Sequence, residues 1–527
     1  MQNQTAFTAL EKLEEKSQLE QGGQLSTSFS EVDASLQKVL YVEGRYQPSA
    51  GQPFEIINPA TEAVIGYGVS ATEAEVDRAI AIANQSQKRW QKLSALERAE
   101  KLHEVALKLD ALTPKLAKLM TLEMGKPYKE SADEIAWCIS ALRYYAEAAR
   151  HEAGKVLGPA VEGQLHYVLK EPLGVVVSIL PFNYPLVLFV WQAAAALAAG
   201  NAVIAKPSEL TTQTTLLSMQ AFESLGAGVV QCLPGDGSVG ARLTASKETH
   251  FVAFTGQLST GKKVASACAE QFKPTLIEAS GNDPFIVMPS APLETAARGA
   301  TFGAFLNCGQ VCTSSERFYV HTDIYDAFVE KLVAHVCQLR VGDGLTAVDV
   351  GPMASSAVRD HFEAIIQTAI DQGAKVACGG QRPESQPKGW FYEPTVLTDV
   401  SHEMDIVKDE AFGPVASVVK VDSLEMAIQL ANDSPFGLGA TIYTQNLAES
   451  IRATNELQAG MVWVNAPLLD NDAGPFGGRK MSGIGRELGS EGLDTFRHTK
   501  LVMIDPEANP QDFWWFPYAD EESYSAQ

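Results

Sequence analysis

The sequence predicts an α/β protein built from two doubly wound parallel-sheet domains and a small projecting β hairpin. Four short apolar segments fit buried strands and are each followed by a helical run; they span residues 175–180, 202–205, 229–233 and 251–254. A second alternating series of the same kind runs from near Phe285 to near Val464. The segment Leu165-His-Tyr-Val-Leu-Lys170 alternates in polarity after Gly- and Pro-rich turns, which predicts the hairpin strand.

Before the first series we expect an arm, then short strands and long helices. The first forty residues are rich in Gln, Glu and Ser, which predicts a mobile arm over 1–40 with one helix around Phe7 to Leu19. Two short strands follow at 55–57 and 64–67. Apolar residues then recur every three or four positions, which predicts helices over 74–93, 95–112, 114–124 and 133–152.

The C-terminal tail, residues 506–527, is rich in aromatic residues. The run Asp512-Phe-Trp-Trp-Phe-Pro-Tyr518 contains five of them ahead of an acidic tip. Five exposed aromatic side chains would form an adhesive patch, so we expect the tail to pack on folded surface of its own subunit or of a neighbour.

Composition limits the class of protein and its partners. A chain of 527 residues with 46% hydrophobic content can form two or three domains, and its longest apolar stretch, 186–199, is too short to span a bilayer. The net charge of −23 disfavours nucleic acid and anionic membranes as partners. The N-terminus lacks the basic and apolar regions of a signal peptide, and an odd number of cysteines, seven, favours reduced thiols. These features predict a cytoplasmic protein.

Cys312, in Asn307-Cys-Gly-Gln-Val-Cys312-Thr, is the strongest candidate nucleophile. A single cysteine is more often a small buried hydrophobe, but a thiolate is also the best side-chain nucleophile at neutral pH when a base accompanies it. Glu278, in Leu276-Ile-Glu-Ala-Ser-Gly281, lies in an apolar segment where a surface carboxylate is not expected. Cys308 and Cys312 form a lone CxxxC without a second pair or histidines, so no metal site is predicted.

Further motifs occur in a fixed order along the chain. They are Gly174-Val-Val-Val-Ser-Ile-Leu-Pro-Phe-Asn183-Tyr-Pro, Asn201-Ala-Val-Ile-Ala-Lys206-Pro-Ser-Glu209, Phe254-Thr-Gly256, Glu410-Ala-Phe412-Gly-Pro and Pro475-Phe-Gly-Gly-Arg-Lys-Met-Ser-Gly483. With Cys312 and Glu278 they resemble the aldehyde dehydrogenase superfamily, from about Tyr41 to about Val502. Branches of that family that pass the acyl group to coenzyme A lack the carboxylate at Glu278. The resemblance therefore implies the hydrolytic, non-acylating branch, with a free acid as product.

The resemblance implies that an aldehyde is oxidised with NAD(P)+ through a thioester. Cys312 would attack the aldehyde carbonyl, and the side-chain amide of Asn183 with the backbone N–H of Cys312 would stabilise the oxyanion. After hydride transfer, Glu278 would activate the water that hydrolyses the thioester.

The same resemblance implies a division of the chain into domains. Residues 41–150 and 173–284 would form the NAD(P)-binding domain, a modified Rossmann domain, and 285–480 the catalytic domain. The segments 151–172 and 485–505 would be oligomerisation segments, because such strands pair across subunits in relatives. We therefore expect a homodimer or a homotetramer.

The cofactor site departs from the usual dinucleotide fingerprint, since no GxGxxG follows a strand. The nearest equivalent is Gly256-Gln-Leu-Ser-Thr-Gly261, which precedes a helix expected over 262–270 whose N-terminus can receive a pyrophosphate. Glu209 favours NAD because a carboxylate accepts hydrogen bonds from a ribose 2′-OH, whereas Lys206 leaves NADP possible. The residues expected to bind cofactor are Pro181, Phe182, Lys206, Ser208, Glu209, Gly235, Phe254, Thr255, Gly256, Gln257, Gly261, Glu410 and Phe412.

Substrate-channel residues are expected around the nucleophile, although the aromatic ones fit core positions nearly as well. The loop from Ala466 to Gly474 contains two carboxylates and no Lys or Arg, which favours a neutral or cationic aldehyde over an anionic one. A basic residue could still enter from Arg298 or from near Lys126. The expected channel residues are Tyr184, Trp191, Val311, Thr313, Asp470 and Phe476.

The expected proton relay differs from that of many relatives. Its glutamate is present as Glu487, but the position of its lysine, after Trp191, is occupied by Gln192, which cannot carry a proton. A relay through water, or a less direct one, is therefore implied.

Two other classes of function remain open. A cysteine hydrolase or acyltransferase would also use Cys312, but it needs a partnered histidine, and none lies near these motifs in the sequence. The other alternative is a catalytically silent family member, which the joint presence of Cys312, Glu278 and Asn183 disfavours.

Overall fold

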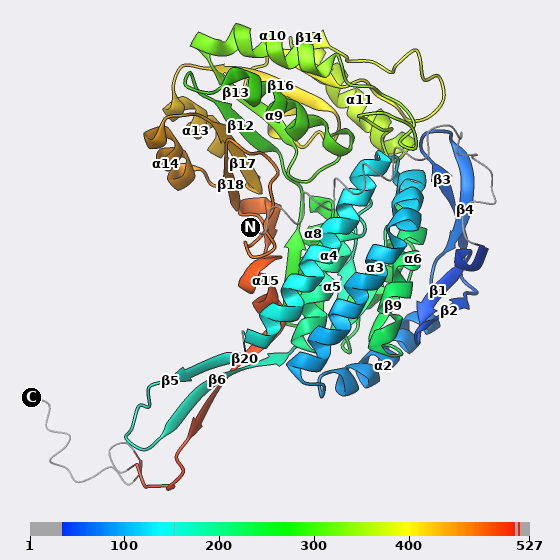
Figure 1. Cartoon of the computed structure of the whole chain (residues 1–527), viewed down its shortest axis with the longest axis vertical. Coiled ribbons are helices and arrows are strands. Elements are labelled where there is room, and N and C mark those ends of the chain that lie inside the picture. The colour runs from blue at the N-terminus through cyan, green and yellow to red at the C-terminus, as the bar shows by residue number, and fades with distance from the viewer. Residues whose placement is uncertain (1–33, 152, 512–514, 517–527) are drawn as a thin grey trace, which may run out of the picture.

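The computed structural model describes residues 34–151, 153–511 and 515–516. It confirms the predicted α/β class: an eight-stranded and a seven-stranded sheet carry helices, and a three-stranded sheet stands apart (Figure 1). The helix expected around Phe7 and most of the aromatic tail lie outside the described residues.

The eight-stranded sheet is doubly wound. From β7 the chain adds β8 and β9 on one side, then crosses to add β10 and β11 on the other, all in parallel. The reversal between β7 and β10 creates a crevice outside the carboxyl ends of these strands, where ligands bind in such sheets. The strands are β1 (Val39–Val42), β2 (Arg45–Pro48), β7 (Val175–Ile179), β8 (Ala202–Lys206), β9 (Val230–Cys232), β10 (Phe251–Thr255), β11 (Thr275–Glu278) and β19 (Gly483–Ile484).

The four strands predicted from apolar segments are β7 to β10, and nearly all of their residues are buried. The helix after β10 begins at Leu258 rather than at Lys262, because Gln257 already serves as its N-cap. The helices that follow the strands of this sheet are α5 (Val187–Ala199), α6 (Thr212–Phe222), α7 (Gly237–Ala245) and α8 (Leu258–Ala269).

The seven-stranded sheet has the order β14-β15-β16-β13-β12-β17-β18 and reverses between β12 and β17. Its first strand begins at Asp283, two residues before the expected start of this series. The strands are β12 (Asp283–Val287), β13 (Ser315–His321), β14 (Lys375–Cys378), β15 (Thr395–Thr398), β16 (Val415–Val421), β17 (Gly439–Tyr443) and β18 (Met461–Val464); the helices are α9 (Leu293–Phe305), α10 (Tyr325–Val336), α11 (Ser356–Asp371), α12 (Asp405–Lys408), α13 (Leu424–Asn432) and α14 (Leu447–Glu456).

The N-terminal helices correct one expectation. The helices predicted over 95–112 and 114–124 form a single helix with Pro114 inside it. Proline removes one helical hydrogen bond and usually kinks or ends a helix. Here Leu109 before it and Leu116 after it are both fully buried in the same core cluster, so packing holds the two halves together. The three helices are α2 (Glu73–Trp90), α3 (Ala95–Met124) and α4 (Tyr128–His151).

The expected arm, residues 1–40, overlaps folded structure at its end. Leu36 and Leu40 are buried in the core, and β1 joins the eight-stranded sheet by pairing with β9 and β2. The core therefore begins before residue 40. The two strands expected next are present as the antiparallel pair β3 (Pro53–Asn58) and β4 (Ala63–Val69).

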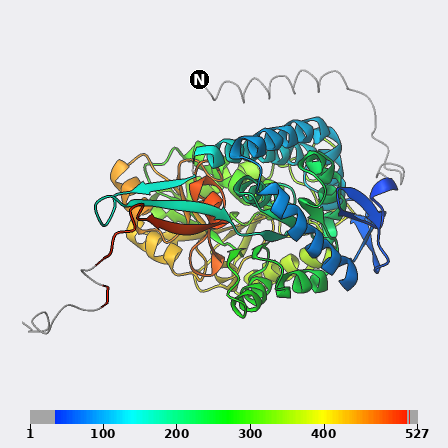
Figure 2. The same cartoon turned by 90° about the horizontal axis from the view of Figure 1, so that it is seen from below.

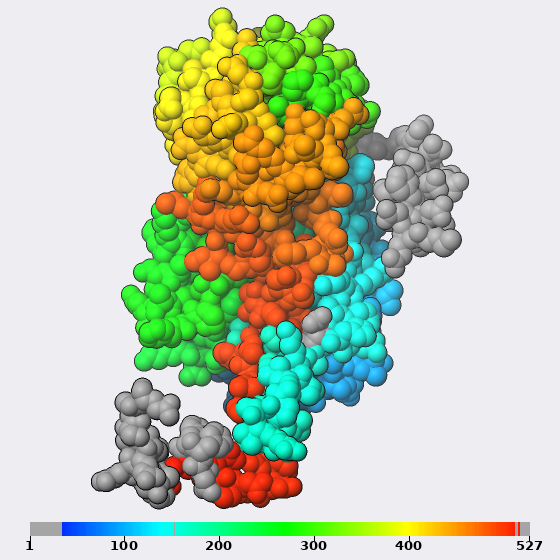
Figure 3. All heavy atoms as spheres, turned by 90° about the vertical axis from the view of Figure 1, so that its left-hand side faces the viewer, coloured from blue at the N-terminus to red at the C-terminus, as the bar shows by residue number. Residues whose placement is uncertain are grey.

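The three-stranded sheet consists of β5 (Gly154–Leu157), β6 (Leu165–Pro172) and β20 (Arg497–Ile504), all antiparallel. It projects from the body of the molecule (Figures 1, 2 and 3). The segment 485–496, expected to be part of an oligomerisation segment, contains α15 (Gly489–Thr495), which contacts α5 and α4. Of the tail aromatics, Trp515 and Phe516 are described and exposed. In the described ranges, no helix is long and apolar enough to cross a membrane.

Candidate active site

A cleft of about 1350 Å³ lies at the carboxyl ends of β7, β8 and β10. Ile179, Lys206 and Thr255, at the ends of these strands, line it on one side. Glu410, Phe412 and Cys312, from the part of the chain that carries the seven-stranded sheet, line the other side. The cleft thus lies at the reversal point of the doubly wound sheet and ends at the candidate nucleophile.

The nucleophile follows a strained segment of backbone. The backbone φ angles of Asn307, Cys308 and Gly309 are 51°, 56° and 71°. These values lie in the left-handed region, which residues other than glycine seldom adopt. A Cβ at Gly309 would lie 2.1 Å from the carbonyl oxygen of Gly413, so only glycine fits there. Cys308 is fully buried, whereas Cys312 is partly exposed and reaches the cleft. Of the two thiols, only that of Cys312 is positioned for chemistry in the cleft.

Glu278 ends β11, directly beside Thr255 on β10, and is 3% exposed. Burial raises the pKa of its carboxyl group, and the approach of the Cys312 thiol partly offsets this rise. Neither carboxylate oxygen accepts a hydrogen bond of normal geometry from a described residue. In turn, burial and the Glu278 charge raise the pKa of the Cys312 thiol. The two groups therefore form a pair that can exchange a proton.

Asn183 is held beside the nucleophile by both its backbone and its side chain. Its carbonyl accepts hydrogen bonds from the buried Lys126 Nζ at 2.6 Å and from Asn307 Nδ2 at 3.1 Å. Its Nδ2 donates one hydrogen bond, to the carbonyl of Gln310 at 3.1 Å, so the second N–H of the amide is available to a ligand in the cleft. The structure brings together all three residues predicted to be catalytic.

Most of the predicted cofactor residues line the cleft. They are Pro181, Phe182, Lys206, Ser208, Glu209, Phe254, Thr255, Gly256, Gln257, Glu410 and Phe412. Lys206 is buried and pairs with the half-exposed Glu209, with 3.1 Å between Nζ and Oε2. The ring of Phe412 packs edge-on against Phe182 with 5.9 Å between centroids.

Gly235 and Gly261 do not line the cleft, contrary to the sequence prediction. A Cβ at Gly261 would lie 3.3 Å from both Ile277 and Phe254, so this glycine allows α8 to pack closely on its sheet. Gly235 has a φ of 146°, and a Cβ there would lie 2.5 Å from Val239. Both glycines serve chain packing. Sequence reasoning instead missed Gly237 and Gly240 of α7, which do line the cleft; the signal was two glycines opening a helix after a strand.

The residues present fit a dinucleotide. The cleft exceeds the range of about 300–1,000 Å³ that is usual for small-molecule sites, so it has room for two linked nucleotides. Gly256 and the start of α8 open into it, and the N-cap Gln257 makes no side-chain capping hydrogen bond. Free N–H groups at a helix N-terminus favour a pyrophosphate.

The predicted substrate-channel residues approach Cys312 from outside this cleft. Tyr184, Trp191, Val311 and Phe476 belong to one apolar cluster against which Cys312 packs, and the Trp191 and Phe476 rings lie 5.1 Å apart. Trp137, which the sequence did not single out, lies 6.2 Å from the Tyr184 ring and is 43% exposed.

The channel loop carries negative charge. Asp470 is exposed, while Asp472 is partly buried and accepts a hydrogen bond from Ser140. Desolvation by the surrounding residues and the Asp472 charge raise the pKa of Asp470. Lys126 is not available as a counter-charge, because its Nζ is fully buried and pairs with Glu134 at 2.5 Å. Thr313, the remaining predicted channel residue, is buried next to the nucleophile in sequence.

Gln192 bridges two groups of the expected proton relay. Its Nε2 donates to Glu487 Oε1 at 2.9 Å and to Thr255 Oγ1 at 3.3 Å. Glu487 is buried, and desolvation followed by the Glu278 charge raises its pKa well above the usual range. The amide thus joins Glu487 to the neighbour of Glu278 without itself carrying a proton.

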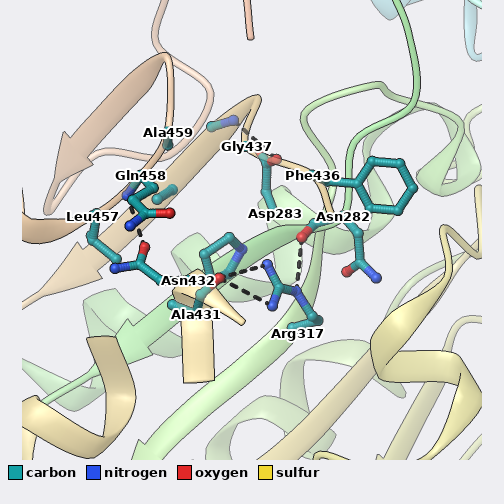
Figure 4. A pocket seen from close by; sticks show the side chains of 13 residues that line it. Asn282, Asp283, Arg317, Ala431, Asn432, Phe436, Gly437, Leu457, Gln458 and Ala459 are labelled. Carbon is teal, nitrogen blue, oxygen red and sulfur yellow. Dashed lines mark hydrogen bonds between the residues drawn. The ribbon is translucent and has the colours of Figure 1, made fainter. Parts of the chain in front are cut away.

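A second cavity, of about 10 Å³, is lined by residues of the seven-stranded sheet and of the loops beside it (Figure 4). This volume holds at most about one water molecule, so it is not a ligand site. Asp283 accepts a hydrogen bond there from the Gly439 N–H at 3.0 Å, and Arg317 donates to the carbonyls of Asn282 and Ala431 (Figure 4). The cavity marks a buried polar junction within the seven-stranded sheet.

Comparison with known proteins gives consistent results. The family model described as "Aldehyde dehydrogenase family" matches residues 46–502. The chain is 38% identical over 494 residues to a chloroplastic aminoaldehyde dehydrogenase of Arabidopsis thaliana, covering 91% of this chain and 98% of the relative. It resembles a betaine aldehyde dehydrogenase of Staphylococcus aureus solved with NAD+, with a TM-score of 0.88, 33% identity and coverage of 91% and 97%. It also resembles a Bacillus cereus aldehyde dehydrogenase solved with NAD+, with a TM-score of 0.87, 37% identity and coverage of 89% and 96%.

Proposed function

This chain belongs to the aldehyde dehydrogenase family, and on that premise we propose that Cys312, Glu278 and Asn183 oxidise an aldehyde with a neutral or cationic far end to the free acid. The enzyme is an NAD(P)-dependent oxidoreductase. The observation that carries the proposal is the Cys312 thiol beside the buried Glu278, at the end of a cleft sized for a dinucleotide. The hydrolase and silent-member alternatives are not favoured.

In the first half of the cycle Cys312 Sγ bonds to the aldehyde carbon, and Glu278 accepts the thiol proton, which it must release to water before the second half begins. The free N–H of the Asn183 amide and the backbone N–H of Cys312 donate hydrogen bonds to the oxygen that becomes negative. Lys126 and Asn307 hold the Asn183 carbonyl, so the amide is oriented before substrate arrives. Bound NAD(P)+ supplies the hydride acceptor, and loss of hydride leaves a thioester on Cys312.

In the second half Glu278 accepts a proton from the water that attacks the thioester. The C–S bond breaks, the carboxylic acid leaves, and Glu278 returns the proton to the Cys312 sulfur, which restores the thiol. The raised pKa of Glu278 suits this role, since a base works best when its pKa is near the working pH. Between the two halves the thiol proton leaves Glu278 through water near Thr255 and Glu487, which the Gln192 amide joins without carrying the proton.

The preference for a cationic or neutral far end rests on Asp470, Asp472 and the ring pair of Trp137 and Tyr184. Carboxylates attract a cation, and aromatic faces bind ammonium groups. The relatives named as aminoaldehyde and betaine aldehyde dehydrogenases support this choice. An anionic aldehyde would meet two carboxylates, with Lys126 already paired.

Aldehydes of matched length should therefore differ in kcat/KM according to the charge at their far end. An aldehyde with an ammonium end should give a kcat/KM about tenfold or more above its carboxylate-ended counterpart, measured by NADH absorbance. Asp470→Asn should reduce this ratio while leaving the neutral aldehyde nearly unchanged. A wild-type enzyme that prefers the carboxylate-ended aldehyde would rule out this part of the proposal.

We also propose that NAD is preferred over NADP because of the Lys206–Glu209 pair. Lys206 is neutralised by Glu209, so a 2′-phosphate would compete with a carboxylate for it. Glu209→Gln should raise kcat/KM for NADP and narrow the gap between the cofactors. The idea fails if the wild-type enzyme prefers NADP in steady-state kinetics.

The three-stranded sheet supports a homo-oligomer, as a dimer or a tetramer. Val156, Leu501 and Met503 on its strands are exposed, and an open apolar sheet of this kind needs a partner. Sedimentation should give a species at least twice the 56.7 kDa monomer mass, and Leu501→Asp should shift it towards monomer. A wild-type monomer would contradict this.

All seven cysteines are free, which supports a cytoplasmic location that fractionation can test.

A further inference from the structure

A buried carboxyl group holds the segment 410–412 on one wall of the cleft. Glu316 Oε2 accepts a hydrogen bond from the Ala411 N–H at 2.8 Å, and its Oε1 accepts one from the Phe412 N–H at 2.9 Å. Glu316 is 1% exposed and lies on β13, four residues after Cys312. One strand thus follows the nucleophile and fixes the segment 410–412, which lines the same side of the cleft as Cys312.

The contact restrains a backbone conformation that is unfavourable by itself. Phe412 has a φ of 49°, in the left-handed region that is rare for an aromatic residue. Such a residue persists only when its surroundings determine its conformation. Here the restraints are the two backbone hydrogen bonds that Glu316 accepts and the close packing of Gly309 against the Gly413 carbonyl.

Glu316 has no cationic partner among the residues described. The adjacent Arg317 points elsewhere and donates to the carbonyls of Asn282, at 2.8 Å, and Ala431, at 3.3 Å (Figure 4). Burial and the Glu410 charge raise the pKa of Glu316 to about 8, against the two backbone N–H groups that lower it. The hydrogen bonds of this carboxyl group therefore all go to the segment 410–412.

We propose that Glu316 is a positioning residue that holds Glu410 and Phe412 against the nicotinamide half of the cofactor. It does so without touching cofactor or substrate, because it acts through two backbone N–H groups. The inference rests on the proposed function and on the family resemblance, which implies that Glu410 adjoins the nicotinamide ribose and Phe412 the nicotinamide ring.

Glu316→Gln tests the proposal with almost no change of shape. The amide keeps one acceptor oxygen, but its NH₂ group faces a backbone N–H, so one hydrogen bond is lost. Above about pH 8, where the carboxyl group of Glu316 is ionised, the Kd of NAD measured by calorimetry should rise about tenfold, as expected for losing a hydrogen bond to a charged group. The Kd of ADP, which has only the adenosine half, should stay within about twofold because that half binds at the other end of the cleft.

Glu123→Gln is the matched control. Glu123 is also buried and accepts hydrogen bonds from two backbone N–H groups, those of Gln213 and Thr214, but it lies near the end of α3 and holds the start of α6. This variant should lower the melting temperature while leaving the ratio of NAD to ADP affinity unchanged. If Glu316→Gln does not fold, Glu316→Asp replaces it as the test. The shorter side chain keeps the carboxyl group but moves it away from the two backbone N–H groups. It should therefore change the ratio of NAD to ADP affinity in the same direction.

Phe412→Ala distinguishes failure of this inference from failure of the proposed function. If Phe412→Ala changes the NAD-to-ADP ratio and Glu316→Gln does not, the positioning role is wrong. If neither variant changes the ratio, the placement of the nicotinamide beside Phe412 is wrong, and the inference falls with it. Equal weakening of NAD and ADP by Glu316→Gln would indicate a general structural role and would also overturn the proposal.

Discussion

Replacing Cys312 with alanine should abolish NAD reduction while leaving cofactor binding nearly unchanged. No other group in the cleft can form the covalent bond to the aldehyde carbon in the proposed cycle, so kcat should fall on the order of 10⁴-fold or more. The side chain is partly exposed and packs only at the edge of the core, so its loss should leave the fold intact. Steady-state NADH formation and NAD titration by calorimetry together measure both effects.

Cys308→Ala is the matched control for this substitution. It lies in the same loop, but its side chain is buried in the core of the seven-stranded sheet and burial raises its pKa strongly. Its replacement should cost some stability and leave kcat within a few-fold of the wild type. The assignment of the nucleophile would be wrong if Cys308→Ala were the inactive variant.

Replacing Glu278 with glutamine should block the second half of the cycle selectively. Thiol attack and hydride loss can still proceed with solvent as the base, but no group then activates water against the thioester. Stopped-flow mixing should show at most one NADH per active site, followed by turnover reduced about 10²–10⁴-fold.

The pH profile gives a second test of this role. Burial raises the pKa of Glu278, so it becomes an effective base only at higher pH than an ordinary glutamate. The wild-type rate of deacylation should therefore increase as the pH rises through the pKa of Glu278, because only the ionised carboxylate can accept a proton from water. Glu278→Gln should lose this dependence, and a variant that turned over steadily at the wild-type rate would refute the role.

Local sequence patterns predicted the strands β7 to β10 of the eight-stranded sheet well, because each is a short apolar run between turns. They failed at Pro114, where buried leucines on both sides hold one helix together across a residue that normally ends it. They did not indicate α15, whose place depends on its contacts with α4 and α5, distant in sequence.

The active-site residues show the same contrast between local motifs, which can be identified in the sequence, and contacts between distant segments, which cannot. Cys312, Glu278 and Asn183 lie in recognisable motifs, so they could be identified without a structure. Gly261 could not be assigned correctly, because only the spacing of α8 from Phe254 and Ile277 shows what its missing side chain permits. Glu316 gave one local signal, an acidic residue in an apolar strand, but its partners Ala411 and Phe412 are nearly a hundred positions away.

The acyl group on the nucleophile tests the account most directly. Glu278→Gln mixed with NAD and an aldehyde should be quenched and digested, and the peptide that contains Cys312 analysed by mass spectrometry. The account predicts that Cys312 carries the acyl group, that the adduct needs both NAD and aldehyde, and that hydroxylamine removes it. NADH formation with Cys312 unmodified, or with the acyl group on Cys308, would contradict the covalent cycle.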